Sequence, residues 1–284
     1  MVGRGVLWFQ IRRAFGSKVL PYVFLFSFGV AAVCYFQTCL KFWGHDISEV
    51  PSAAVAWAGN SRSMETSAFA YFLNYLVLPL AAAIFGGSFC DDVRSGLAVN
   101  GAVRSSVREY TVCGAIAAFL AAFCAMSTAL LASQLLAYLS FPAASSPDAY
   151  QSAGFFTAEF DSLDHLSGGL FGHLRVSNRS LCNVVFAVQA SLWAAAGSAV
   201  AYAVSLFSNK SRLLAIGVPA LAFAVANMVL PQELAPLALM DAILYDSGAG
   251  GYSLAVFVLE PLAILALSVL AVFATARLKR DVLL

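Results

Sequence analysis

The sequence predicts an all-α integral membrane protein, and three observations support this prediction. The mean hydropathy of the 284 residues is +0.83, with 61% hydrophobic and only 11% charged residues. So few charges cannot cover a water-soluble surface. The hydrophobic residues form long continuous runs, whereas the strands of a membrane β-barrel alternate over about ten residues. We therefore expect six transmembrane helices within one transmembrane domain, 1–284, at 19–40, 67–90, 110–141, 182–207, 213–230 and 252–276.

The segment 5–18 predicts a helix that lies in the plane of the membrane surface. Apolar side chains fall near one face and two arginines fall away from it: Leu7, Trp8, Ile11 and Phe15 against Arg12 and Arg13. This pattern is typical of an interfacial helix. The alternative is a cytoplasmic extension of the first span. The run at 19–40 is longer than the apolar core of a signal peptide, so we expect a retained span.

The basic residues sort to one side of the membrane if six spans alternate. On one side fall Arg4, Arg12, Arg13, Lys18, Arg94, Arg104, Arg108, Lys210, Arg212, Arg277, Lys279 and Arg280, and on the other fall Lys41, Arg62, Arg175 and Arg179. Positive charge favours the cytoplasmic side, so both termini are expected in the cytoplasm. Two outer loops are then 41–66 and 142–181. The apolar, glycine-containing stretch 231–251 predicts a half-sunken outer helix between spans five and six.

The motifs of common enzymes and metal sites are absent from the sequence. There is no G-x-x-x-x-G-K-[ST] loop, no H-E-x-x-H and no G-x-S-x-G. The acids and histidines of an outer loop match no ligand spacing, and a solvated surface is the simpler interpretation: Glu159, Asp161, Asp164, His165 and His173. The six cysteines fall in or beside spans, as packing residues do. A net charge of +1 gives no reason to expect a nucleic-acid partner. We expect no enzyme activity and no metal site in this chain.

Glu260 is the one acid well inside a predicted span. A charge at the middle of a membrane helix costs about 2.5–3.5 kcal/mol, so such residues usually face the interior of a bundle. Glu260 either lines a substrate path or is a protonated or hydrogen-bonded structural residue. Small residues spaced along 194–205 indicate close helix packing, either within the chain or across a dimer.

The stretch 86–110, GGSFCDDVRSGLAVNGAVRSSVREY, gathers charge between two apolar runs. We expect a helix from Asp92 onward, with Asp91 and Asp92 at its positively polarised N-terminus. A turn is expected at Asn100–Gly101, and the outward apolar residues are Val93, Leu97 and either Ala98 or Val99. A short helix of this kind at the mouth of two spans predicts a docking element. The alternative is an ordinary basic cytoplasmic loop.

This stretch resembles the loop between the second and third spans of ABC-2-type transporter permeases. The resemblance is carried by Gly86 and Gly87, Asp92 four residues before Gly96, Asn100, Arg104, Arg108 and Tyr110. The chain is also similar to that family in its six spans, internal termini, interfacial N-terminal helix and half-sunken outer segment. It departs from the family in three features: Asp replaces the commoner Glu, no proline stands near Val103, and the loop 142–181 is long.

The resemblance implies a permease subunit of an ATP-driven exporter, in the plasma membrane of a bacterium. A separate ATPase subunit is implied to grip this loop as a coupling helix and to bind ATP and magnesium, while this chain holds no cofactor. The implied coupling residues are Asp91, Asp92, Arg94, Gly96, Arg104 and Arg108. A second permease copy or a paralogue completes the implied assembly. The alternative functions are a secondary transporter that uses Glu260, and a membrane scaffold or sensor without transport activity.

Overall fold

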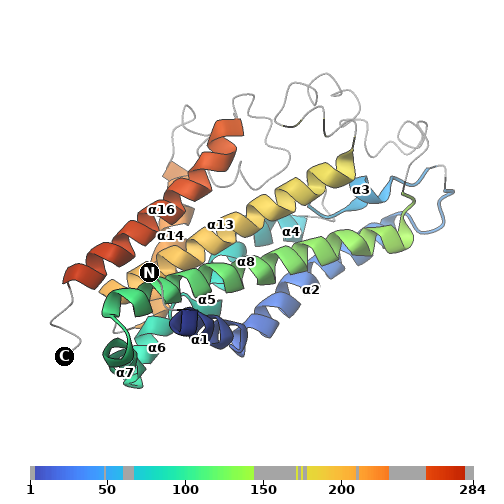
Figure 1. Ribbon diagram of the computed structural model, residues 1–284. Coiled ribbons are helices and arrows are strands. Elements are labelled where there is room, and N and C mark those ends of the chain that lie inside the picture. Colours follow the sequence, from blue (N-terminus) through green and yellow to red (C-terminus); the bar gives the residue numbers. More distant parts are fainter. Residues whose placement is uncertain are drawn as a thin grey trace.

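The computed structural model of the chain describes residues 4–47, 49–59, 67–143, 171, 174, 178–208, 211–229 and 254–278. Every regular element within these residues is a helix (Figure 1). The predicted outer segment 231–251, most of the loop 142–181, and the acids and histidines weighed as metal ligands lie outside the described residues. The prediction of an all-helical chain is confirmed for the part that the structure describes.

Five helices in the described part of the chain are long and apolar enough to cross a membrane. They are α2 (Val19–Lys41), a composite helix over Ser67–Arg94, α8 (Val107–Ser140), α13 (Arg179–Phe207), and Phe257–Arg277 within α16 (Leu254–Leu278). The predicted run 213–230 falls on α14 (Arg212–Val229), whose apolar portion is shorter. These helices indicate a multi-pass membrane protein.

The composite helix is continuous but irregular. It consists of α4 (Ser67–Tyr71), the π-helix η1 (Phe72–Leu76), α5 (Val77–Phe85) and α6 (Ser88–Arg94). Pro79 has no N–H for the carbonyl of Tyr75, and its ring crowds that carbonyl in a regular α-helix. The wide π turn falls where this conflict arises, because a π turn lets the backbone pair differently.

Helix α13 lies at the centre of the bundle and packs against α8, α5, α14 and α16. The small residues noted in the sequence are buried on it: Ala194, Ser198, Ala201 and Ser205. Ser198 donates a hydrogen bond to the carbonyl of Ala118 in α8 at 3.3 Å. A Cβ at Gly86 would lie 2.7 Å from the Cβ of Ala201. The small residues therefore pack helices within this chain, since lipid supplies no hydrophobic force between helices and close approach must replace it.

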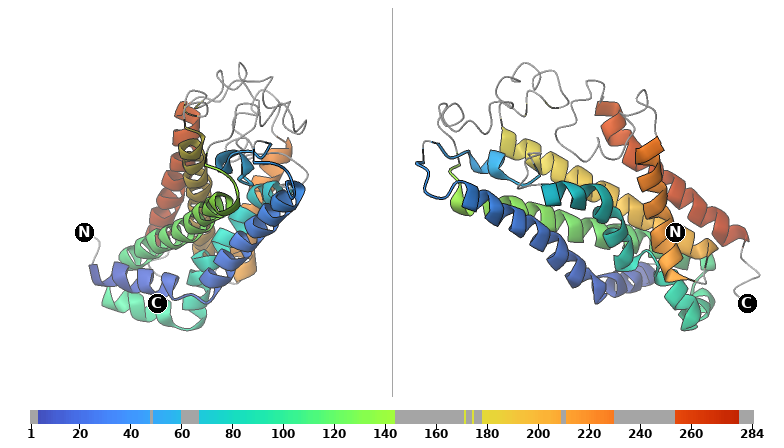
Figure 2. Two further views of the ribbon diagram at one scale, coloured as in Figure 1. Left: turned by 90° about the vertical axis from the view of Figure 1, so that its right-hand side faces the viewer. Right: turned by 180° about the vertical axis from the view of Figure 1, so that it is seen from behind.

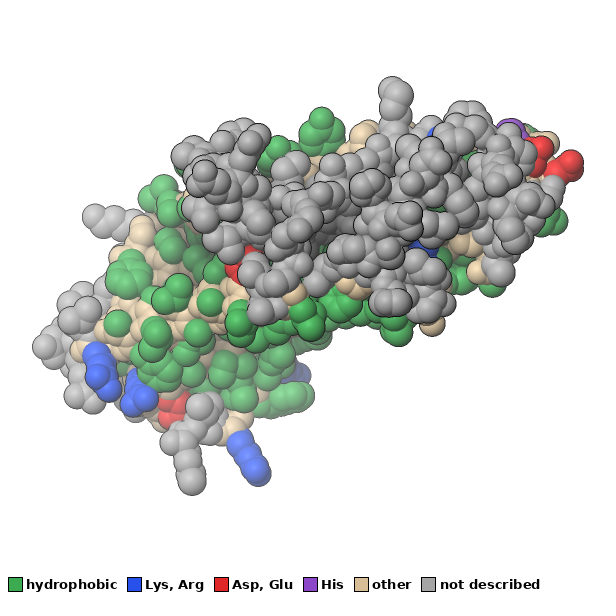
Figure 3. All heavy atoms as spheres, turned by 90° about the horizontal axis from the view of Figure 1, so that it is seen from above, with side chains coloured by type: hydrophobic (Ala, Val, Ile, Leu, Met, Phe, Trp, Pro, Cys, Tyr) green, Lys and Arg blue, Asp and Glu red, His purple; other side chains and the backbone are tan. Residues whose placement is uncertain are grey.

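The helices run back and forth between two ends of an elongated bundle (Figures 1 and 2). One end carries α1 (Arg4–Phe15), α6, α7 (Leu97–Arg104), the start of α14 and the end of α16, while α3 (Ala53–Ala56) lies at the other. The first end, called here the basic end, holds Arg4, Arg12, Arg13, Lys18, Arg94, Arg104, Arg108, Arg212 and Arg277 among the described residues. Figure 3 shows basic side chains at this end and hydrophobic side chains along the adjoining flank.

Helix α1 forms as predicted but turns one of its arginines inward. Gln10 and Ala14 are fully buried, Arg13 is partly buried beside them, and Trp8 and Phe15 are exposed. The prediction that Arg13 turns away together with Arg12 is wrong. The reason is that Arg13 finds a carboxylate partner in α6, which a helical wheel of α1 alone does not include.

Candidate functional site: the α6–α7 hairpin

Helices α6 and α7 form a short hairpin, residues 88–104, at the basic end of the bundle. Gly96 joins them with a φ of +74°, in the left-handed region that glycine adopts without a steric penalty. The hydroxyl of Ser95 donates to the carbonyl of Asp91 at 2.8 Å, which closes the last turn of α6. This segment, the α6–α7 hairpin, projects beyond the apolar helices that flank it (Figure 1).

The hairpin differs from the predicted helix in two places. Helix α6 begins at Ser88 and not at Asp92, so Asp91 falls in its first turn while Asp92 lies beyond that turn. Asn100–Gly101 lies inside α7, and the turn falls at Ser95–Gly96. Asn–Gly favours turns when it stands alone, but here the flanking Leu97 to Arg104 continue the helix through it.

The carboxylate of Asp92 in α6 is held inside the protein by side chains of two other helices. Arg13 of α1 donates both guanidinium amines to it, one Nη1–Oδ2 distance being 3.1 Å, and the two groups form an ion pair. The hydroxyl of Tyr110 in α8 donates to the same Oδ2 at 2.7 Å. Asp92 is only 1% exposed and Arg13 is 25% exposed. We call this group the Arg13–Asp92–Tyr110 cluster, and it joins α1, α6 and α8.

The electrostatics of the cluster favour its charged form. A buried carboxylate is stable only when it is paired and its oxygens are hydrogen-bonded, and both conditions hold for Asp92. Burial lowers the pKa of the Arg13 guanidinium, but the hydrogen bond and charge of Asp92 outweigh it, and the net pKa is raised. The Arg13 guanidinium also lies 5.5 Å from the ring centroid of Phe9 and 5.8 Å from that of Phe85. Arg13 is therefore a permanent cation at the base of α1.

A second ion pair ties the hairpin to α14. Arg212 donates to Asp91 Oδ2 at 3.0 Å and to the carbonyl of Ala83 at 2.8 Å. The two charged side chains are 35% and 45% exposed, so water screens this pair more than the first. A Cβ at Gly87 would lie 2.5 Å from Cγ of Arg212, which explains the glycine at that position.

The ring of Tyr110 also supports α7. A Cβ at Gly101 would lie 2.4 Å from Cε2 of Tyr110, so the backbone of α7 rests directly on the ring. Tyr110 thus contacts both helices of the hairpin, α6 through its hydroxyl and α7 through its ring. The start of α8 is therefore in direct contact with the hairpin.

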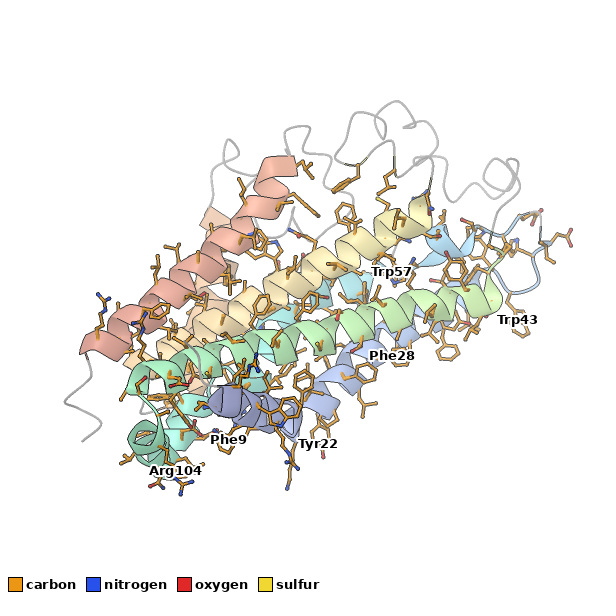
Figure 4. The ribbon with its side chains drawn as sticks, in the orientation of Figure 1. Phe9, Tyr22, Phe28, Trp43, Trp57 and Arg104 are labelled. Carbon is orange, nitrogen blue, oxygen red and sulfur yellow. The ribbon has the colours of Figure 1, made fainter. Side chains whose placement is uncertain are left out.

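The outward surface of the hairpin is mixed apolar and basic. Leu97 is 39% and Val99 is 43% exposed, and Arg94 and Arg104 are exposed beside them. Figure 4 places Arg104 at the tip of this end. Ala98, one of the two alternatives for the outward apolar position, is buried. Arg108 is exposed at the start of α8, with its guanidinium 4.6 Å from the ring centroid of Phe273 in α16.

The predicted coupling residues therefore separate into two groups. Arg94 and Arg104 face outward and can reach a partner. The carboxylates face α1, α8 and α14, Gly96 makes the turn, and Arg108 covers Phe273. Direct contact between Asp92 and a partner is incompatible with its burial, so its place is that of an internal anchor.

Sequence reasoning missed the partners of these carboxylates. Signals for part of the arrangement exist: Ser106 and Glu109 form an S-x-x-E capping pattern, and the Ser106 hydroxyl accepts from the Glu109 N–H at 3.1 Å, which starts α8 at Val107. The spacing of Val6, Gln10, Arg13 and Ala14 on one helical face is a second signal. This face places two polar side chains between two apolar ones. It therefore predicts a polar partner for Arg13 inside the protein once a buried acid is known.

Glu260 lies in α16, partly buried and directly before Pro261. Pro261 leaves the carbonyl of Phe257 without its helical donor, and Gln189 of α13 donates to that carbonyl at 2.5 Å. No group of three or more potential metal ligands occurs in the described ranges. Comparison with protein-family models, with curated proteins and with solved structures found no match to this chain.

Proposed function

We propose that this chain is the membrane-spanning permease subunit of an ATP-driven exporter, with α14 as the fifth of six spans and the basic end in the cytoplasm. The observation that carries the proposal is the α6–α7 hairpin, a projecting helical element with an apolar and basic outer surface and a rigid internal attachment to three other elements. The sorting of basic residues to the same end supports the cytoplasmic placement.

The proposed mechanism follows from the attachments of the hairpin. A separate ATPase subunit binds Leu97, Val99, Arg94 and Arg104, and nucleotide binding moves that surface. The Arg13–Asp92–Tyr110 cluster passes the movement to α1 and α8, and the Asp91–Arg212 pair passes it to α14. The long helices then exchange between arrangements open to different sides or leaflets of the membrane. ATP and magnesium are held by the ATPase, and a second permease copy or paralogue forms the other half of the pathway.

The test is co-purification of the full chain with candidate ABC-type ATPase subunits from the same organism, with ATP hydrolysis as a second readout. Leu97→Glu and Val99→Glu place a charge on the outer surface of the hairpin and are expected to abolish both co-purification and stimulated hydrolysis. Ile47→Glu is the matched control, because Ile47 is 80% exposed at the opposite end of the bundle. If the hairpin variants bind and stimulate the ATPase as well as Ile47→Glu does, the proposal is wrong.

A further inference from the structure

The outward face of α1 carries large aromatic side chains that the rest of the chain leaves uncovered. Trp8 is 66%, Phe9 is 46% and Phe15 is 44% exposed, while the polar Gln10 and Arg13 face the protein. The inward face also carries Val6, Ile11 and Ala14, which pack against the core, so α1 has apolar side chains on both faces. The outer face of α1 must therefore meet an apolar surrounding that the chain itself does not provide.

Basic side chains lie among these aromatic rings. Arg12 follows Trp8 by four residues, precedes Phe15 by three and is exposed with them, and Arg4 stands on the same side. The two arginines are eight residues apart, which is about 12 Å along a helix. Lys18 is exposed just beyond the end of α1, at the start of α2. We call Arg4, Trp8, Phe9, Arg12, Phe15 and Lys18 the α1 outer face.

The position of α1 relates this face to the membrane surface. Helix α1 lies across the basic end of the bundle, where the apolar helix α2 begins (Figure 2). The first turns of α2 expose Tyr22, Leu25 and Phe26, so exposed apolar side chains continue from α1 into the span. Phe9 and Tyr22 are both drawn at the lower border of Figure 4, below the bundle. A helix that lies in the membrane interface meets acyl chains on one side and headgroups on the other.

We infer that the α1 outer face binds the headgroups of anionic phospholipids. Arg4, Arg12 and Lys18 contact the phosphates, and Trp8, Phe9 and Phe15 enter the boundary between headgroups and acyl chains. Aromatic rings are favoured at that boundary, and each basic residue near an anionic surface strengthens binding about fivefold. The inference requires only the membrane location and does not depend on an ATPase partner.

The opposite face of α1 connects this lipid binding to the α6–α7 hairpin. Arg13 forms an ion pair with Asp92 of the hairpin, while the α1 outer face binds lipid. Helix α1 therefore links the α6–α7 hairpin to the lipid headgroups. Arg12 and Arg13 are adjacent in sequence but face different surroundings: Arg12 is exposed on the α1 outer face, and Arg13 is paired with Asp92.

The experiment titrates the purified full chain with phosphatidylglycerol and with phosphatidylcholine and counts bound lipid by native mass spectrometry. The expected result is tighter binding of phosphatidylglycerol, with an affinity that falls as ionic strength rises. Arg12→Gln/Lys18→Gln is expected to weaken phosphatidylglycerol binding at least fivefold. Arg94→Gln/Arg104→Gln removes the same charge at the same end of the molecule but from the hairpin, and is expected to leave the affinity within twofold. Both double variants change exposed side chains, and their thermal midpoints are measured to show that each variant is folded when its lipid affinity is determined.

A photoreactive residue in place of Trp8 identifies what covers the face in a bilayer. Crosslinks to lipid support the inference, and crosslinks to a second copy or to another protein overturn it. Equal affinity for the two lipids overturns the inference as well. An equal loss of affinity in the two double variants also overturns it, because the binding would then reflect net charge and not the α1 outer face.

Discussion

The centre of the bundle and its basic end are held together by different chemistry. Between α8 and α13 the contacts are small residues: Ala194 and Ser198 are fully buried, and Gly114 lies directly against the ring of Tyr202. At the basic end, the hairpin is attached through ion pairs and a tyrosine hydroxyl, by the Arg13–Asp92–Tyr110 cluster and by Asp91 with Arg212.

The difference teaches which kind of contact holds each part of the bundle. Interdigitated small residues have one close-packed arrangement, and any change of volume is costly. Ion pairs and hydrogen bonds have discrete made and broken states, which is what a two-state element requires. The seam between α8 and α13 is therefore the close-packed frame of the bundle, whereas the basic end is held by a few ion pairs and hydrogen bonds.

The largest effect is expected at the buried ion pair. Asp92→Asn keeps the size of the side chain and removes its charge, so Arg13 loses its counterion in a partly buried site. Breaking a buried pair costs about 3–5 kcal/mol, and the partial exposure of Arg13 places the cost near the lower limit, about 3 kcal/mol. The measurement is the midpoint of thermal unfolding in detergent.

The matched control for that variant is Arg13→Met/Asp92→Leu. Replacing both charges by apolar groups leaves no buried ion, so this double variant should recover most of the lost stability. If the double variant unfolds at the same temperature as Asp92→Asn, the loss comes from packing around α6 and not from the uncompensated charge.

The second effect tests the frame. Gly114→Ala puts a Cβ 2.0 Å from the hydroxyl oxygen of Tyr202, whose ring is fully buried and cannot move aside. Overpacking of this kind costs about 1–3 kcal/mol. The Tyr202 hydroxyl has no hydrogen-bond partner in the described structure, so Tyr202→Phe should be neutral or stabilising by itself.

Combining the two changes sharpens the result. Gly114→Ala/Tyr202→Phe should lose less stability than Gly114→Ala, because the atom in closest conflict is gone. Gly29→Ala in α2 serves as the control, since a Cβ there meets nothing within 4 Å. An equal loss for Gly29→Ala and Gly114→Ala would remove the distinction between frame and periphery.

The frame could be predicted from sequence in outline, and the basic end could not. Continuous apolar runs give the approximate place of the long helices, because crossing a bilayer sets a minimum helix length. They do not give the number, since six spans were predicted and five helices in the described part of the chain are long and apolar enough. The small residues of α13 indicated close packing, but a spacing along one helix does not say which helix approaches it. Only the structure shows that Ala118 and Gly86 lie opposite.

Asp92 illustrates why the site was harder to predict from the sequence than the long helices were. A local pattern placed it at a helix N-terminus on an exposed loop, whereas its burial depends on Arg13, 79 residues earlier, and on Tyr110. Long-range pairs leave no trace in local periodicity. The turn at Gly96 was obscured for a related reason, since Asn100–Gly101 is the stronger local turn signal and the helix of α7 overrides it.

The third effect lies between α13 and α16, outside the α8–α13 seam. Gln189→Leu removes the donor to the Phe257 carbonyl, which Pro261 leaves without a partner inside α16. Hydrogen bonds between membrane helices contribute about 1 kcal/mol on average, so a loss of about that size is expected. Gln189→Leu/Pro261→Ala should recover it, because an alanine N–H at position 261 can donate to the same carbonyl. A failure to recover would show that Gln189 acts through another contact.

The smallest effect is expected at the exposed pair, and it completes the comparison within the basic end. Asp91→Asn removes one charge from a half-exposed ion pair with Arg212, and such pairs contribute at most about 1 kcal/mol. The loss should shrink further as salt is raised, because ions screen exposed charges within about 10 Å at 0.1 M. Asp92→Asn, one residue away and chemically identical, should lose several times more stability and keep that loss at high salt. Thermal unfolding of the two variants across a salt series measures both quantities. Equal losses with equal salt dependence would mean that burial does not separate the two carboxylates, and the division into an internal anchor and a surface contact would be wrong.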